Sequence, residues 1–146
     1  MPKVYTVDAS VFLNAFLPRE AGHAESTSLL TRLRDASAPV VVPTLLLPEV
    51  AAAIARGQSD DMLARAFAGA LRRLPHLVWI PLDDALAQSA AEVAAQHRLR
   101  GSDAVYAAVA LRFGSVLVTL DHEQRERLTT VLDARTPAEA LADGPS

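Results

Sequence analysis

The stretch Val4-Tyr5-Thr6-Val7-Asp8-Ala9-Ser10 carries the first signal for the fold. Residues 4–7 predict a short strand, which ends on the carboxylate of Asp8 and passes at once into a helix. A strand that carries an acid to the edge of a sheet places negative charge where a ligand can bind. Asp8 is therefore the first candidate site residue.

The composition describes an ordinary domain with room for a hydrophobic core. The chain has 146 residues, of which 51% are hydrophobic and 28 are alanine, as expected for a helix-rich globular protein. No apolar run approaches the roughly 20 residues of a membrane span, and the opening residues lack the pattern of a secretion signal. The absence of cysteine excludes disulfides and thiol chemistry. We expect a single domain over residues 1–146, cytoplasmic and without a membrane partner.

The net charge of -3 argues against a protein that coats nucleic acid electrostatically. It allows an enzyme that makes a few local phosphate contacts. The basic residues are 13 arginines and a single lysine, Lys3. Arginine suits bidentate phosphate binding, but a GC-rich codon bias, which also favours alanine, explains the same skew.

Strand-like and helical segments alternate with short connections, which is typical of a parallel sheet covered by helices. The strands are expected over residues 4–7, 40–42, 77–80, 115–119 and 130–132. Residues 40–42 are fully apolar, as in a strand that is buried on both faces. The sequence therefore predicts an α/β fold with a mostly parallel sheet of four to five strands.

Helices are expected between these strands, with caps at Ser59, Asp83 and Ser102. Their predicted ranges are 9–17, 23–34, 45–57, 60–74, 84–98, 103–113 and 121–127, with a last turn after residue 137. The regular part of the third helix is expected to begin at Pro48, which puts Glu49 in its first regular turn. The apolar stripe over residues 62–74 would serve the core, or a dimer or partner surface. Residues 142–146 are expected to fray.

Four acids fall at the ends of these elements, and each has an ordinary structural explanation. Asp8 and Asp121 would cap helices, and Gln124 would complete a capping box with Asp121. Asp103 would complement a helix dipole. Glu49 would point to solvent.

Together the four acids carry a stronger signal than any one alone. Asp8 and Asp121 follow strands, while Glu49 and Asp103 lie in the first turns of helices; in a parallel sheet these positions face one edge. Converging carboxylates repel one another unless a cation neutralises them. An oxygen-only set without His or Cys suits Mg²⁺ or Mn²⁺, which can hold a water for attack on phosphorus. The pattern predicts a metal-dependent nuclease.

Four segments of the chain resemble the PIN-domain ribonucleases, and most closely the small bacterial toxins of the VapC type. The segments are 7–12 (VDASVF), 47–50 (LPEV), 100–110 (RGSDAVYAAVA) and 117–121 (LVTLD). Their order and spacing match from Val4 to about Thr130. One departure is that Asp121 is followed by His122-Glu123-Gln124 and lacks the aromatic residue often found there, which affects local packing more than chemistry.

The resemblance implies a three-layer α/β/α sandwich with the first strand at its centre. It implies that one or two Mg²⁺ or Mn²⁺ ions are surrounded by four acids: Asp8, Glu49, Asp103 and Asp121. Asp8 and Asp103 would be direct ligands, and Glu49 and Asp121 would act directly or through water. Supporting hydrogen bonds would come from Ser10, Thr119 and Asn14.

The resemblance also implies an endoribonuclease that cuts single-stranded regions of structured RNA such as tRNA or rRNA, leaving a 3′-hydroxyl and a 5′-phosphate. Such a toxin forms a homodimer and is inhibited by a small antitoxin, which typically places a basic side chain in the acidic pocket. Two alternatives stay open. One is a non-catalytic PIN-like module that binds RNA or protein, which a missing acid would favour; the other is a processing nuclease without an antitoxin.

Four arginines flank the acidic segments and are candidates for RNA phosphate contacts, although a solvated face explains each equally well: Arg98, Arg100, Arg125 and Arg127. The four histidines have no metal-ligand spacing. No glycine-rich phosphate loop occurs. The lone lysine argues against other Asp-centred α/β folds, which use a lysine late in the chain.

Overall fold

Five short strands form one sheet in the order β3-β2-β1-β4-β5, and every neighbouring pair is parallel. In the computed structural model, which describes residues 3–143, the strands are β1 (Tyr5–Val7), β2 (Val40–Pro43), β3 (Leu77–Ile80), β4 (Val116–Val118) and β5 (Ala134–Arg135). β1 is central, as the resemblance implied. The sheet is wholly parallel, which sharpens the expectation of a mostly parallel one.

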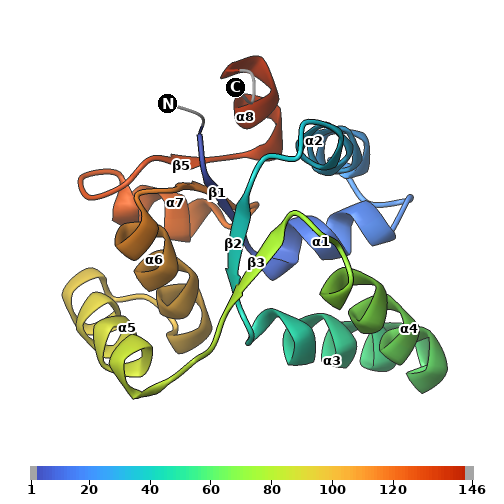
Figure 1. Cartoon of the computed structure of the whole chain (residues 1–146), viewed down its shortest axis with the longest axis horizontal. Coiled ribbons are helices and arrows are strands. Elements are labelled where there is room, and N and C mark those ends of the chain that lie inside the picture. Colours follow the sequence, from blue (N-terminus) through green and yellow to red (C-terminus); the bar gives the residue numbers. More distant parts are fainter. Residues whose placement is uncertain (1–2, 144–146) are drawn as a thin grey trace.

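Helices cover both sides of the sheet. They are α1 (Ala9–Phe16), α2 (His23–Asp35), α3 (Leu46–Gln58), α4 (Asp61–Arg72), α5 (Asp84–His97), α6 (Gly101–Phe113), α7 (His122–Leu128) and α8 (Pro137–Asp143). α1 to α4 lie on one side of the central strands and α5 and α6 on the other (Figure 1). This arrangement confirms the three-layer α/β/α fold. None of the helices in the described part of the chain has the length and hydrophobicity of a bilayer span.

The centre of the sheet is completely covered. Tyr5 pairs in register with Val40 of β2 and with Val116 of β4, and every residue of β1 and β2 is buried. Strands buried on both faces are predominantly apolar, and the one hydroxyl of β1 that is buried with a partner, Thr6 Oγ1, lies 2.6 Å from Ser115 Oγ. The position of Asp8, directly after β1, is therefore fixed by the most deeply packed strand.

α6 is the helix that packs most directly on the sheet. Its residues 104–110 are all buried, and it contacts β1, β2 and β4. A helix that is apolar all round is a core helix, and its many alanines allow close approach to the strands. This packing fixes the first turn of α6, which carries Asp103.

The predicted fifth strand was misplaced. Residues 130–132 form a turn after α7, in which the amides of Val131 and Leu132 donate to Leu128 O. The strand lies instead at Ala134–Arg135 and pairs with β4. Val131 is 39% exposed. A β-branched residue favours a strand mainly where it packs against neighbouring strands, and Val131 has no such surroundings.

Two predicted helix caps were also wrong, while Asp83 caps α5 as expected by accepting from Leu86 N at 2.9 Å. Asp60, rather than Ser59, caps α4 by accepting from Leu63 N, and Ser59 ends α3 with φ 51. α6 begins at Gly101 without a side-chain cap, so Ser102 lies inside the helix. An N-cap residue has an extended backbone, which Asp60 adopts with φ -140 and ψ 98, whereas the backbone of Ser59 is left-handed.

The apolar stripe of α4 is divided between core and surface. Leu71 is buried, whereas Met62 is 75% exposed. The prediction that residues 142–146 fray is wrong for Ala142 and Asp143, which belong to α8; residues 144–146 lie outside the described residues.

Candidate active site

Asp8 is the innermost acid of the candidate site. It caps α1, yet only 4% of it is exposed. Its Oδ1 accepts hydrogen bonds from the amide of Ser10 at 2.9 Å and from the Ser10 hydroxyl. Its Oδ2 accepts from Thr119 Oγ1 at 2.6 Å. The capping role and a buried, fully oriented carboxylate therefore coexist.

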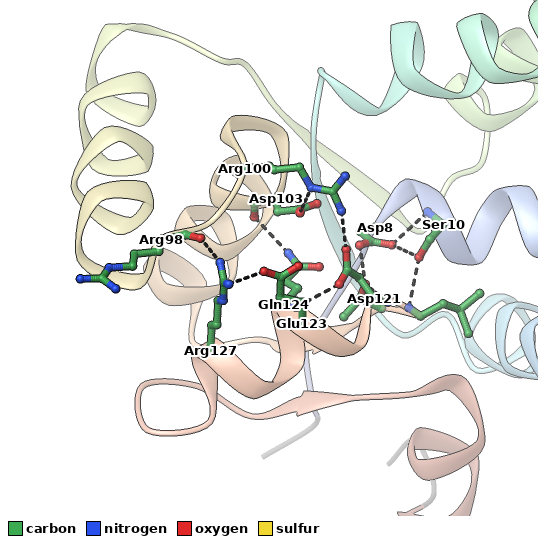
Figure 2. Close-up of polar contacts among 11 residues, drawn as sticks. Asp8, Ser10, Arg98, Arg100, Asp103, Asp121, Glu123, Gln124 and Arg127 are labelled. Carbon is green, nitrogen blue, oxygen red and sulfur yellow. Dashed lines mark hydrogen bonds and ion pairs between the residues drawn. The ribbon is translucent and has the colours of Figure 1, made fainter.

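Ser10 and Thr119 join the ends of two neighbouring strands around Asp8. The Ser10 hydroxyl also accepts from Leu120 N at 3.1 Å, and Thr119 Oγ1 accepts from Asp121 N at 3.0 Å. Figure 2 shows this chain of contacts from Ser10 through Asp8 toward Asp121. The network positions Asp8 and Asp121 relative to one another, because each is bonded to Thr119.

Asp103 and Asp121 lie at the rim of the site and share one arginine. Arg100 Nη2 donates to Asp121 Oδ2 at 3.0 Å, and Arg100 Nε lies 3.5 Å from Asp103 Oδ2 (Figure 2). Asp121 also caps α7 through Gln124 N at 3.1 Å. The Gln124 side chain donates to Asp103 O at 3.1 Å and so links α7 to α6. The predicted capping box is therefore only half formed.

Glu49 reaches the same edge from the first turn of α3. It accepts a hydrogen bond of 2.6 Å at Oε1 from the hydroxyl of Tyr106, and it is partly buried. Tyr106 lies three residues after Asp103 on α6, so both side chains are on one face of that helix. Glu49 therefore does not simply point to solvent.

The acids influence each other's ionisation, which places them within electrostatic reach of one another. Burial, with a smaller contribution from the charge of Asp103, raises the pKa of Asp8 to about 6, against the opposing hydrogen bonds from Ser10 and Thr119. Burial and Asp103 raise the pKa of Glu49, and Tyr106 opposes this rise. Burial and Asp121 raise the pKa of Asp103, and Arg100 opposes this rise. Such repulsion is the signature of a site that favours a cation.

The donor set fits a hard divalent cation in kind. The side-chain acceptors are all carboxylate oxygens, which Mg²⁺ and Mn²⁺ prefer. Within residues 3–143, no three His, Cys, Asp or Glu side chains form a ready-made metal cluster. The Arg100 guanidinium instead lies between two of the acids, so cation binding requires rearrangement at the rim.

The other predicted residues lie in different surroundings. Asn14 is buried, but its amide donates to Ala21 O at 2.9 Å and holds the connection to α2. Arg125 donates to Thr119 O at 2.9 Å. Arg127 pairs with Glu123 and donates to Arg98 O.

Two residues in the site were not identified from the sequence as parts of it. Tyr106 was visible in the sequence only as part of a family segment, although its position three residues after Asp103 could have indicated it. Gln124 had been given only a capping role. It is 1% exposed, and its contact with Asp103 O depends on how α7 meets α6.

The chain has a parallel sheet, and its carboxylates gather at the carboxyl ends of the strands. It is therefore an α/β protein of the class that binds ligands at this edge of the sheet. The chain belongs to the PIN domain family, whose sequence pattern matches residues 5–127. Proteins of this family are typically metal-dependent nucleases. No curated protein sequence matches the chain.

Several solved structures share the fold at low sequence identity. VapC20 of Mycobacterium tuberculosis, described as a Sarcin-Ricin loop cleaving toxin, has a TM-score of 0.70 and 21% identity, over 84% of this chain and 93% of that one. FitAcB of Neisseria gonorrhoeae has a TM-score of 0.71 and 15% identity, over 93% and 99%. DNA-bound VapBC of Salmonella typhimurium has a TM-score of 0.69 and 15% identity, over 94% and 99%. These likenesses establish the PIN-like fold.

Proposed function

We propose that the chain is a Mg²⁺- or Mn²⁺-dependent endoribonuclease that acts on structured RNA, such as tRNA or rRNA, as the toxin of a type II toxin–antitoxin pair. The observation that carries this proposal is Asp8, a nearly inaccessible carboxylate with three hydrogen-bond donors at the edge where Asp103 and Asp121 lie. A helix cap alone needs neither the burial nor the Thr119 contact.

The four acids would have two roles, as direct ligands of the ion and as groups that contact it directly or through water. Asp8 and Asp103 would hold the divalent ion, with Asp121 and Glu49 beside it, directly or through water. When bound, the ion supplies an activated water and neutralises charge that builds up on the phosphate. Glu49, oriented by Tyr106 and raised in pKa by burial, suits the acceptance of a proton from that water.

Around these acids the chain supplies orientation. Ser10 and Thr119 keep Asp8 in one rotamer, a role that commonly changes metal affinity or activity by about 10- to 100-fold when lost. Arg125 and Arg127 stay candidates for RNA phosphate contacts from this rim, whereas the Arg98 side chain points away from it (Figure 2). A homodimer and a small antitoxin are part of the proposal, supported by the fold shared with toxin–antitoxin complexes.

Purified protein should cleave a structured RNA when Mg²⁺ or Mn²⁺ is present and stop when EDTA is added. Asp8→Asn should reduce the rate by at least about a hundredfold. The matched control is Asp83→Asn, because Asp83 also caps a helix, by accepting from Leu86 N at 2.9 Å, and lies outside the acid cluster. Full cleavage by the Asp8→Asn protein would exclude the mechanism.

The toxin role is tested separately in cells. Expression of the chain should arrest bacterial growth, and sequencing of RNA 5′ ends after brief expression should reveal a small set of cut sites. Co-expression of a small protein encoded directly upstream should restore growth. Cleavage in vitro without growth arrest would favour a processing nuclease, and binding of RNA without cleavage would favour the non-catalytic module.

A further inference from the structure

The Arg100 side chain contacts two acids of the site, Asp103 and Asp121, and the second of these is distant in the sequence. Arg100 is the N-cap residue directly before α6, and its side chain makes no capping hydrogen bond there. Its guanidinium instead reaches both rim acids, 3.5 Å from Asp103 Oδ2 and 3.0 Å from Asp121 Oδ2. Figure 2 shows the side chain crossing from α6 to the start of α7. One cation thus neutralises two carboxylates.

The acids are held by other contacts and do not need this arginine for their placement. Asp121 is bonded through its own amide to Thr119 and through Oδ1 to Gln124 N. Asp103 belongs to the first turn of α6, and its backbone is bonded to Gln124. The Arg100 side chain is 77% exposed, whereas those of Asp103 and Asp121 are 20% and 23% exposed. Arg100 is therefore the movable partner.

We propose that Arg100 is a built-in counter-ion that competes with the divalent cation for Asp103 and Asp121 and so sets the divalent affinity of the site. This inference rests on the metal site of the proposed function. Exposed ion pairs are weak and are exchanged easily, so the guanidinium can neutralise the rim acids without metal and give way to a divalent ion.

The chain offers a matched control two residues away. Arg98 carries the same charge, and its residue is exposed. In Figure 2 its side chain points away from Asp103 and Asp121. Arg98→Gln therefore changes the net charge near the site as Arg100→Gln does, while leaving the contacts of Arg100 in place.

The test is direct Mn²⁺ binding to metal-free protein, followed by electron paramagnetic resonance or calorimetry. Removal of a competitor that makes two weak ion pairs should tighten Mn²⁺ binding by about three- to tenfold in Arg100→Gln. Arg100→Lys should be intermediate, because a single ammonium cannot bridge both acids as a guanidinium does. Arg98→Gln should stay within about twofold of the parent, as expected for a screened surface charge. The rise in melting temperature on adding Mn²⁺ should follow the same order.

Unchanged or weaker Mn²⁺ binding by Arg100→Gln would overturn the inference, since Arg100 would then organise the acids and not compete for them. An equal gain in Arg98→Gln would also overturn it, as an effect of overall charge. Failure of every variant to bind Mn²⁺ would remove both this inference and the proposed metal chemistry. Binding in the expected order by a protein that cuts no RNA would reject the proposed nuclease and support the role of Arg100.

Discussion

Asp8 and the rim pair Asp103–Asp121 carry the same charge at the same edge of the sheet, but they are held in opposite ways. Asp8 is 4% exposed and is fixed by uncharged donors from Ser10 and Thr119. The rim acids are partly exposed and share a largely exposed guanidinium. One part of the site is built into the core, and the other can exchange its partner.

The difference follows from the position of each acid in the fold. Asp8 follows the central strand, so its surroundings are set by β4 and α1, which are packed around it. Asp103 and Asp121 lie on the first turn and at the cap of two helices, where solvent reaches them. A buried carboxylate needs hydrogen bonds to stay ionised, whereas an exposed pair can rely on a mobile counter-ion. Rigid and adaptable acids therefore lie side by side.

Among the residues that hold the acids in place, the largest effect is expected at Thr119. Thr119→Val removes the donor to Asp8 and the acceptor for Asp121 N, and should weaken Mn²⁺ binding by about 10- to 100-fold. It should also lower the free energy of unfolding by about 1–3 kcal/mol, because buried polar groups lose partners. Calorimetry with Mn²⁺ and urea unfolding measure the two effects.

Thr6→Val is the matched control for this prediction. Thr6 is a buried threonine of β1 whose hydroxyl lies 2.6 Å from Ser115 Oγ, so it contacts none of the four acids. It should be destabilised similarly and bind Mn²⁺ normally. Weakened binding by both variants would mean that general loosening of the sheet, and not the Asp8 contact, controls the metal.

The second prediction uses pH to separate the buried acid from the rim. Because burial raises the pKa of Asp8 to about 6 and a metal binds the ionised carboxylate, Mn²⁺ affinity should fall roughly tenfold between pH 7 and pH 5. Cleavage rates should fall in the same range. An affinity that is constant from pH 7 to pH 5 would contradict the buried-acid description.

Stability of the metal-free protein should change in the opposite direction. The folded pKa of Asp8 lies above its ordinary value of 3.8, so its stabilising effect is fully present below that value and is lost as pH rises through about 6. The loss amounts to about 3 kcal/mol at most. Urea unfolding from pH 4 to pH 7 should show it as a difference between the parent and Asp8→Asn, in which this titration is absent. Parallel pH profiles of the two proteins would refute it.

The smallest effect is expected at Glu49. Burial and the nearby Glu49 carboxylate raise the pKa of Tyr106, so its hydroxyl remains a neutral donor to Glu49. Tyr106→Phe should reduce kcat by about tenfold or less and leave KM for RNA nearly unchanged. Tyr5→Phe serves as control, because the Tyr5 hydroxyl is buried without a hydrogen-bond partner in the described part of the chain. Equal losses in both variants would place the effect in the core and not at Glu49.

Much of the fold could be predicted because its signals are local. Apolar runs such as residues 40–42 specify a strand buried on both faces, and the cap at Asp83 can be read from a few neighbours. The fifth strand could not be predicted in this way. Residues 134–135 have no strand pattern of their own and become β5 only because β4 offers an unpaired edge.

The candidate site likewise has parts that could be predicted from local signals and parts that could not. The residue types and their spacing indicated Asp8, Glu49, Asp103 and Asp121. An acid directly after a parallel strand faces the carboxyl edge, and the family segments placed the two helix-start acids, Glu49 and Asp103, with them. The sequence also matched Ser10 and Thr119 to supporting positions. Asn14 was expected nearby as well, but its side chain turns to Ala21, since the conformation of the following connection decides its partner.

The sequence by itself therefore determined that four acids reach one edge of a parallel sheet, because strand order in the chain and helix-start positions are local properties. Only the tertiary structure decided how each acid is held. The burial of Asp8, the Tyr106 contact with Glu49 and the bridge made by Arg100 join residues from different elements. Their distances depend on how α6 and α7 pack against the sheet, and no pattern within a single segment contains that information.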